Sequence, residues 1–235
     1  MKYFLFVIIS ISILASCKMR RITGSGNIIT KTRQLNSFTS ISASGGITVD
    51  IQYGPQTSVV VEADDNLEPY IETKVVGGKL SIAIEKYTSF RNTTMFVHIT
   101  MPYVEGISTS ASATVTTKTI MKGNNEVDLK ASSGSKITVN LDAPTIKADA
   151  SSGAEINTAG FTKNAITSAS SGSNINFADL KAETASANVS SGATINIFAS
   201  IKVNATASSG GNISYRGGAK EIVKNESSGG SVNEE

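Results

Sequence analysis

The C-terminal half of the chain repeats one pattern of apolar and polar positions. In most repeats two apolar residues flank a polar one, as Ile137 and Val139 flank Thr138. A two-residue period is typical of a β-strand with one buried and one solvent-facing side. The first apolar position recurs as Ile156, Ile175, Ile195, Ile213 and Val232. The pattern therefore predicts one strand per repeat, with the Ile or Val side chain in the core.

A Ser-Ser-Gly triplet stands just before each of these strands. Its glycines are residues 134, 153, 172, 192, 210 and 229, so the repeats are 18 to 20 residues long. A period of this length indicates a solenoid, in which each repeat packs on its neighbours. We expect the glycine to allow a turn, and continued alternation to place the second serine inside the fold. The predicted inward row of hydroxyl groups is Ser133, Ser152, Ser171, Ser191 and Ser209.

A second alternating segment, richer in small residues, precedes each triplet. A third, shorter side is expected around Leu141, Phe161, Leu180 and Ile201. Three short strands per coil predict an all-β fold, a single-stranded, right-handed parallel β-helix with coils of about 19 residues. In such a fold each strand bonds to its counterpart one coil away, at a spacing of about 4.8 Å.

The N-terminal half is also β-rich but less regular. Strand alternation is clear in residues 47–51, 59–61 and 80–84, and residues 42–47 and 110–115 resemble irregular members of the repeat. We therefore divide the folded chain into an irregular β region over residues 35–120 and regular coils over residues 121–235.

Charged residues gather in the last coil, where we expect them to protect an exposed strand edge. They are Lys220, Glu221, Lys224, Glu226, Glu234 and Glu235.

The first 17 residues match a bacterial lipoprotein signal. A positive start at Met1 and Lys2 precedes an apolar run that is too short for a comfortable membrane span. The run ends in Leu-Ala-Ser-Cys, and Cys17, the single cysteine of the chain, would carry the acyl chains. Several acyl chains anchor a protein stably. The alternative is a cleaved secretory signal with an incidental cysteine.

Residues 18–34 are interpreted as a tether between the anchor and the folded region. Lys18 follows the cysteine, and because this residue is not Asp it favours the outer membrane as the destination. The protein would then face either the periplasm or the cell surface. A net charge of +2 with 17% charged residues gives no basic field for nucleic acid, so we exclude nucleic acid as a partner.

The sequence shows no pattern of catalytic or metal-binding residues. His98, the only histidine, stands in an alternating strand without a Ser-His-Asp, His-x-x-x-His or Cys-His arrangement near it. We interpret it as a solvated strand residue. The acidic residues of the regular coils occupy different coil positions and do not stack into a cluster. We predict no catalytic residue, no metal and no cofactor.

Four residues of the N-terminal half are candidates for ligand binding. Asp64 and Asp65 belong to the densest acidic group, in a segment interpreted either as a solvated loop or as a Ca²⁺ or substrate site. Tyr70 and Tyr87 would offer stacking faces to sugars, or else pack in the core or at its rim.

Several segments taken together resemble a known family. They are Phe38-x-x-Ile41, Gly46–Ile51, Val59–Asn66, Val76–Ile82 and Val97–Pro102, followed by the Ser-Ser-Gly coils. With these segments the chain resembles the auto-transporter adhesin family with the head GIN domain, over residues 35–232. The resemblance implies an exported, often lipid-anchored β-helical protein of Bacteroidetes-type bacteria. It implies no established activity and supplies no catalytic residues.

The leading functional prediction is a non-enzymatic cell-envelope lipoprotein whose β-helix acts as an adhesin or as a glycan- or protein-binding module. Its partners would be the membrane, through the lipid anchor, and a glycan or an envelope or host protein, and a homo-oligomer is left open. Two alternatives stay open as well. One is a polysaccharide-active enzyme that uses Asp64 or Asp65, and the other is an envelope scaffold or stress-sensing partner.

Overall fold

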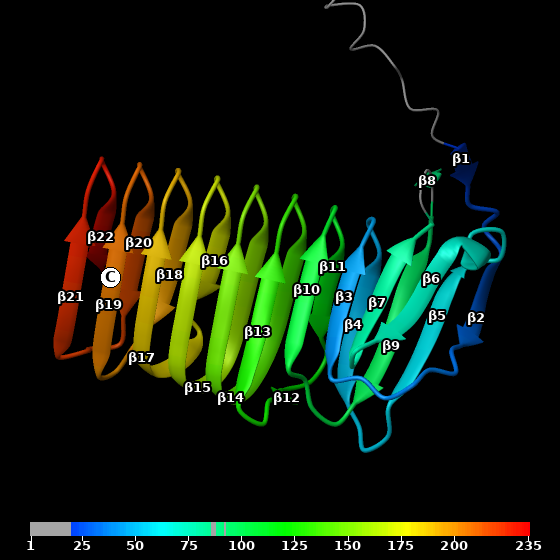
Figure 1. Cartoon of the computed structure of the whole chain (residues 1–235), viewed down its shortest axis with the longest axis horizontal. Coiled ribbons are helices and arrows are strands. Elements are labelled where there is room, and N and C mark those ends of the chain that lie inside the picture. The colour runs from blue at the N-terminus through cyan, green and yellow to red at the C-terminus, as the bar shows by residue number, and fades with distance from the viewer. Residues whose placement is uncertain (1–19, 86–87, 92) are drawn as a thin grey trace, which may run out of the picture.

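The computed structural model describes residues 20–85, 88–91 and 93–235. Their secondary structure is almost entirely β, and the strands form one long stack (Figure 1). The stack is a β-solenoid of about seven turns, held by parallel pairing between neighbouring coils. The predicted all-β parallel solenoid is confirmed.

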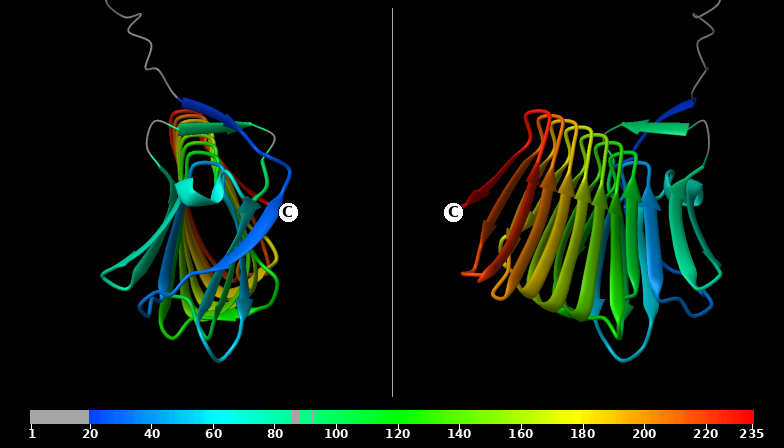
Figure 2. Two further views of the ribbon diagram at one scale, coloured as in Figure 1. Left: turned by 90° about the vertical axis from the view of Figure 1, so that its right-hand side faces the viewer. Right: turned by 60° about the vertical axis from the view of Figure 1, so that its left-hand side comes forward.

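Each coil contributes one strand before and one strand after its corner, which gives the solenoid two long sides (Figure 2). Side 1 holds the strands before the corners: β3 (Ser40–Ser44), β10 (Gly106–Ser110), β13 (Glu126–Ala131), β17 (Leu180–Val189), β19 (Lys202–Ala207) and β21 (Glu221–Glu226). Side 2 holds the strands after them: β4 (Thr48–Tyr53), β11 (Thr114–Thr117), β16 (Asn174–Phe177), β18 (Thr194–Phe198), β20 (Asn212–Arg216) and β22 (Ser231–Glu234). The longer β14 (Lys136–Ala150) and β15 (Glu155–Ala169) run from side 2 into side 1, and β12 (Met121–Lys122) pairs with β14.

The core lies between the two sides and is built from columns of aligned side chains. On side 2, Ile137, Ile156 and Ile175 are successive partners in register and all are fully buried. On side 1, Ala165 pairs with Ala185 at inward positions. The core thus contains columns of large side chains and columns of small ones. Each fully buried Ile contributes about 1.5–3 kcal/mol relative to an exposed one.

The corners correct the prediction for the serines. Ser133 and Gly134 both have positive φ, 54° and 67°, and the Ser135 N–H donates to the Ser132 carbonyl oxygen at 3.3 Å. Two such residues inside one hydrogen-bonded turn make a type I′ turn. Because the turn interrupts the strand alternation, the second serine of each triplet is exposed, and the residue after the glycine is inward instead. The predicted inward row Ser133, Ser152, Ser171, Ser191 and Ser209 is therefore wrong.

The two irregular repeats are confirmed as corners of the same kind. Gly45 and Gly46 have φ of 86° and 73°, and Ala111 and Ser112 have φ of 47° and 62°. β11 pairs in parallel with β4 on one side and with β14 on the other. The solenoid therefore begins at β3, well before the first complete Ser-Ser-Gly triplet.

The predicted third side does not form as a separate strand. Leu141 and Leu180 are buried as expected, but Phe161 and Ile201 are 60% and 52% exposed. Gly160, and not Phe161, pairs with Leu141. A Cβ atom at Gly160 would lie 2.0 Å from the Leu141 carbonyl oxygen, so only glycine fits this inward position. The strand alternation then places Phe161 on the outside of the solenoid.

A second group of strands, here called the cap, covers the first coil. In the cap, β7 stacks in parallel on β3 and β9 stacks in parallel on β4. Beyond these two strands the pairing becomes antiparallel, with β6 on β7, β5 on β9 and β2 on β5. The change of direction ends the solenoid (Figure 2). The elements of the cap are β2 (Ile28–Thr32), β5 (Ser58–Asp64), η2 (a 3₁₀-helix, Glu68–Tyr70), β6 (Ile71–Val76), β7 (Lys79–Ile84) and β9 (Met95–Met101).

Two further strands lie at the cap end of the molecule. β1 (Arg20–Thr23) pairs in parallel with β8 (Thr88–Arg91) and forms a small separate sheet. Residues 28–32 were predicted to belong to the tether, but they form β2 of the cap. The signal segment with Cys17 and the residue Tyr87 lie outside the described residues.

The opposite end of the solenoid is formed by β21 and β22. Lys224 and Glu226 stand in register with the buried Ala205 and Ala207 of the preceding coil. The Lys224 Nζ donates to the Val232 carbonyl oxygen at 3.3 Å, and Glu226 Oε1 accepts the Val232 N–H at 2.5 Å. Inward-pointing charges of this kind make a strand edge unsuitable for pairing with another chain. Within residues 20–85, 88–91 and 93–235, no helix is long and apolar enough to cross a membrane.

Candidate functional site

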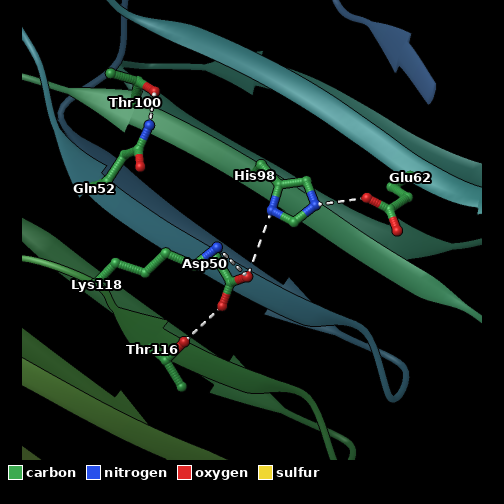
Figure 3. Close-up of polar contacts among 7 residues, drawn as sticks. All are labelled: Asp50, Gln52, Glu62, His98, Thr100, Thr116 and Lys118. Atoms are coloured by element: carbon green, nitrogen blue, oxygen red, sulfur yellow. Dashed lines mark hydrogen bonds and ion pairs between the residues drawn. The ribbon is translucent and has the colours of Figure 1, made fainter.

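His98 lies where the cap meets the first coil, between β4 and β5. In register it faces Asp50 of β4 and Val60 of β5. Its Nδ1 atom is 3.4 Å from Asp50 Oδ2, and its Nε2 atom is 3.2 Å from Glu62 Oε2 (Figure 3). The side chain is 34% exposed. The sequence therefore placed His98 correctly on an outward strand position but missed both of its carboxylate partners.

Asp50 is the most connected residue of this cluster. Besides His98 it contacts the Thr116 hydroxyl, which donates to Oδ1 at 2.8 Å, and the Lys118 ammonium at 3.2 Å (Figure 3). Partial burial raises the pKa of the Asp50 carboxyl, but the hydrogen bonds from Thr116 and Lys118 and the nearby positive charges outweigh it, so the pKa lies below its ordinary value. Asp50 is therefore ionised at neutral pH. Its contacts join β4 of the first coil to Thr116 and Lys118 of the second coil and to His98 of the cap.

A small cleft opens beside this cluster. It has a volume of about 190 Å³ and is lined by Asp50, Gln52, His98, Ile99 and Lys118. The Gln52 Nε2 donates to the Thr100 hydroxyl at 3.2 Å and closes one end of the row of polar contacts (Figure 3). The cleft therefore lies within the N-terminal region, where the cap meets the first two coils, and it holds only a few small groups.

The cluster is a series of charged and polar contacts between neighbouring strands. Both ring nitrogens of His98 face carboxylates, Nδ1 toward Asp50 and Nε2 toward Glu62. The Phe96 ring stacks on the imidazole, with ring centroids 6.1 Å apart. Within residues 20–85, 88–91 and 93–235, no three His, Cys, Asp or Glu side chains are placed to hold a metal ion together. The Lys118, Asp50, His98 and Glu62 series ties β5, β9, β4 and the segment after β11 together.

The candidate Asp64 is a structural residue of the cap. Its side chain is almost fully buried, and both carboxylate oxygens accept backbone hydrogen bonds. Oδ1 accepts from the Gly26 N–H at 2.7 Å, and Oδ2 accepts from the Thr94 N–H at 2.9 Å. A buried carboxylate satisfied in this way holds two distant segments together and leaves no oxygen for a substrate.

The candidate Asp65 binds the same N-terminal segment from the solvent side. It accepts hydrogen bonds from the Ser25 hydroxyl at 2.6 Å and from the Asn27 Nδ2 at 2.8 Å. These two bonds, Ser25 first, hold the pKa of the Asp65 carboxyl below its ordinary value. The polysaccharide-active alternative depended on these two aspartates, and both are engaged with residues 25–27 or 94 of their own chain.

The candidate Tyr70 packs against another aromatic ring. Its ring centroid is 6.1 Å from that of Phe90 of β8, with the planes tilted by 60°. This geometry is a common one for aromatic pairs and joins the 3₁₀-helix of the cap to the small β1–β8 sheet. The structure thus brings Asp64, Asp65 and Tyr70 to one end of the molecule, where they hold the cap together.

A larger groove runs along side 1 beside the corners, and we call it the serine groove. Its volume is about 500 Å³. Serines of successive coils stand in register along it, for example Ser108 with Ser42. In the part of the chain that the structure describes, the groove serines' hydroxyl groups make no hydrogen bond. The groove is lined by Ser42, Ser108, Thr109, Ser110, Lys130, Ala131, Ser132, Asp149, Ala150, Ser151, Ser168 and Ser170.

Lys130 is the one cation of the serine groove. It forms an ion pair with Asp128 at 2.5 Å, and this hydrogen bond and charge raise the pKa of the Lys130 ammonium above its ordinary value. Asp149 follows Lys130 in register on the next coil. The groove therefore combines free hydroxyl groups with one positive and one negative charge.

Comparison with known proteins agrees with this architecture. Residues 37–219 match the model of a family described as a putative auto-transporter adhesin, head GIN domain. A putative adhesin from Bacteroides fragilis superposes with a TM-score of 0.84 at 20% identity, over 91% of this chain and 100% of that one. A putative adhesin from Parabacteroides merdae superposes with a TM-score of 0.73 at 18% identity, over 92% and 99%. A putative lipid binding protein from Parabacteroides distasonis superposes with a TM-score of 0.71 at 20% identity, over 92% and 100%. No curated protein matches the chain.

Proposed function

Because the chain belongs to the head GIN adhesin family, we propose that it is a non-enzymatic adhesion module of the cell envelope that binds its target through the serine groove. The observation that carries this proposal is the row of serine hydroxyl groups that make no hydrogen bond within the described residues. Each hydroxyl both donates and accepts, so the groove complements a surface rich in hydroxyl or amide groups, such as a polysaccharide or a polar protein face. Because the groove serines have short side chains and most of them stand on paired strands, little ordering is needed on binding.

The position of β1, the first strand of the chain, supports this role. β1 lies at the cap end, and β21 and β22 lie at the far end of the stack (Figure 1). A lipid on Cys17 would therefore hold the cap next to the membrane and project the coils, with the serine groove, away from it. Outer-membrane localisation through this anchor is part of the proposal.

Attachment of cells to immobilised polysaccharides and matrix proteins tests the proposal. Cells that lack the protein are complemented with the native chain, with a Ser132→Lys and Ser151→Lys double variant that fills the groove, or with a matched Thr138→Lys and Asn196→Lys variant on the outward face of side 2. We expect the groove variant to lose about tenfold in attachment and the side 2 variant to behave as the native chain. Equal attachment of all strains, including the deletion strain, would overturn the proposal.

A further inference from the structure

A second groove of about 480 Å³ lies at the edge opposite the corners, where side 2 leads into side 1. We call it the phenylalanine groove. Three successive coils contribute to it, with Asp142, Phe161 and Lys181 in register across neighbouring strands. Its other side chains come from Pro144, Lys163, Glu183, Phe198 and Ser200.

Phe161 is a large apolar residue on the outer surface of the solenoid, where it fills no part of the core. It is 60% exposed, in a chain whose large apolar residues are mostly buried. The inward place beside it is taken by Gly160, whose approach to the Leu141 carbonyl oxygen allows no side chain. The fold therefore forces residue 161 outward, and its partners in register there are charged residues. A large exposed ring at such a position marks a binding surface more readily than a core.

A second ring, that of Phe198, lines the same groove. The Lys181 Nζ lies 4.2 Å from its centroid, within the range of a cation–π contact. This contact holds the Lys181 ammonium at the groove and keeps its charge next to Phe161 of the preceding coil. The groove thus contains two aromatic rings with a fixed cation between neighbouring coils.

The remaining charges of the groove are unpaired. Within the part of the chain that the structure describes, the side chains of Asp142, Lys163 and Glu183 make no hydrogen bond and no ion pair. Elsewhere on the coils facing charges do pair, as Lys136 and Glu155 do at 3.0 Å. The groove holds two carboxylates and two ammonium groups, so its charges balance. It offers acceptors and donors without attracting a strongly anionic or cationic polymer.

We propose that the phenylalanine groove binds a neutral hexopyranose unit of a glycan, and this proposal rests on the adhesion function given above. The C–H face of the sugar packs on the Phe161 ring, because an aromatic ring offers a flat apolar surface. Hydroxyl groups of the sugar donate to Asp142 and Glu183 and accept from Lys163 and Lys181. A purely apolar peptide segment would leave Asp142, Lys163 and Glu183 without partners, so a sugar fits the groove better.

The test uses the full chain and defined probes. Binding of methyl β-glucopyranoside, methyl β-galactopyranoside and methyl α-mannopyranoside is measured by saturation-transfer NMR, and binding of the corresponding soluble polysaccharides by calorimetry. The variants are Phe161→Ala, Asp142→Asn and, as matched control, Ile201→Ala, which removes an exposed apolar side chain outside the groove. A heparin fragment and an apolar peptide serve as competing ligand classes.

We expect at least one neutral hexopyranoside to bind, with a loss of about tenfold or more in Phe161→Ala, a smaller loss in Asp142→Asn and no change in Ile201→Ala. Unfolding midpoints separate this result from a folding defect. Failure of all neutral sugars to bind, or equal affinity of Phe161→Ala and the native chain, overturns the inference, as does preferred binding of heparin or the peptide. Attachment that depends on the serine groove but not on Phe161 refutes only the sugar site, whereas unchanged attachment of the deletion strain refutes the adhesion function itself.

Discussion

The cap and the coils are built from the same kind of alternating strand, yet they use their outward polar side chains differently. In the cap, Asp64 and Asp65 bind residues 25–27, and His98 binds Asp50 and Glu62. In the coils, the hydroxyl groups of the groove serines and the side chains of Asp142, Lys163 and Glu183 make no hydrogen bond or ion pair within the described residues. These polar groups of the cap therefore hold its segments together, whereas those of the two grooves are available for a ligand.

The two regions also differ in how they are stabilised. The coils depend on backbone fit between identical layers, in which columns such as Ile137, Ile156 and Ile175 fill a narrow core. The cap depends on contacts between segments far apart in the sequence, including a carboxylate whose partners are 30 and 38 residues away. Substitutions that remove one or the other kind of contact should separate the regions.

The largest effect is expected in the coils, at Gly160. In Gly160→Ala the new Cβ would lie 2.0 Å from the Leu141 carbonyl oxygen, and the residue has a φ of 119°. We expect a loss of about 4 kcal/mol in the free energy of unfolding, measured by urea titration. Gly153→Ala is the matched control, since nothing lies within 4 Å of its Cβ position and only its φ of 71° is unfavourable. The control should cost about 1 kcal/mol, and equal costs would contradict the proposed backbone contact.

The next largest effect is expected in the cap, at Asp64. Asp64→Ala leaves the N–H groups of Gly26 and Thr94 without their acceptor, and one buried orphan group costs about 1–3 kcal/mol. We expect about 3 kcal/mol in total, with hydrogen exchange accelerated in β2 and β5 and unchanged in β15 and β17. Asp149→Ala, an exposed aspartate of the coils, should change neither quantity. Uniform acceleration over the whole chain would show that the cap and coils unfold as one unit.

A smaller effect is expected where the two regions meet, at Asp50, and it depends on pH. The folded-state pKa of Asp50 is depressed, so its contribution is present above the unfolded pKa of about 3.9 and is lost as pH falls through the folded pKa. We expect Asp50→Asn to be about 1 kcal/mol less stable than the native chain at pH 7, with the difference shrinking below pH of about 4. Unfolding at both pH values measures it, and a difference that grows on acidification would contradict the assigned ionic contacts.

The smallest effect is expected for a surface pair of the coils. Glu155 accepts from Asn157 and pairs with Lys136, and these contacts lower the pKa of its carboxyl, but the side chain is 38% exposed. Solvent screens such pairs, so Glu155→Gln should cost at most about 0.5 kcal/mol. A double-mutant cycle with Lys136→Met measures the pair directly. A coupling energy above about 1.5 kcal/mol would mean that the coils, like the cap, depend on ionic contacts.

The same contrast explains how much could be predicted from the sequence. The regular period of Gly134 and its counterparts, with Ile137 in phase, is a local pattern, so it predicted the parallel solenoid and its core. The predicted inward orientation of Ser133 was wrong because a type I′ turn interrupts the strand alternation. The Ser-Gly pair was the signal in the sequence for that turn. Phe161 was wrongly placed in a third side because Gly160 takes the inward position.

The cap could not be predicted from local pattern. β9 lies between β4 and β5, and neither the order nor the register of these strands is encoded by alternation. The partners of His98 were missed for that reason, although Asp50 and Glu62 stand at outward positions of clearly alternating strands. Outward charged residues on several such strands were the only signal that pointed to a shared cluster.

One attachment assay tests most directly whether target binding depends on the serine groove of the coils rather than on the cap. Cells carrying the Ser132→Lys and Ser151→Lys variant, which blocks the serine groove, are measured beside cells carrying His98→Gln, which disrupts the polar cluster at the cap. Equal amounts of folded protein on the cells are confirmed for both by limited proteolysis. We expect the groove variant to lose attachment and the His98 variant to retain it. Loss of attachment in the His98 variant with full attachment of the groove variant would contradict this expectation.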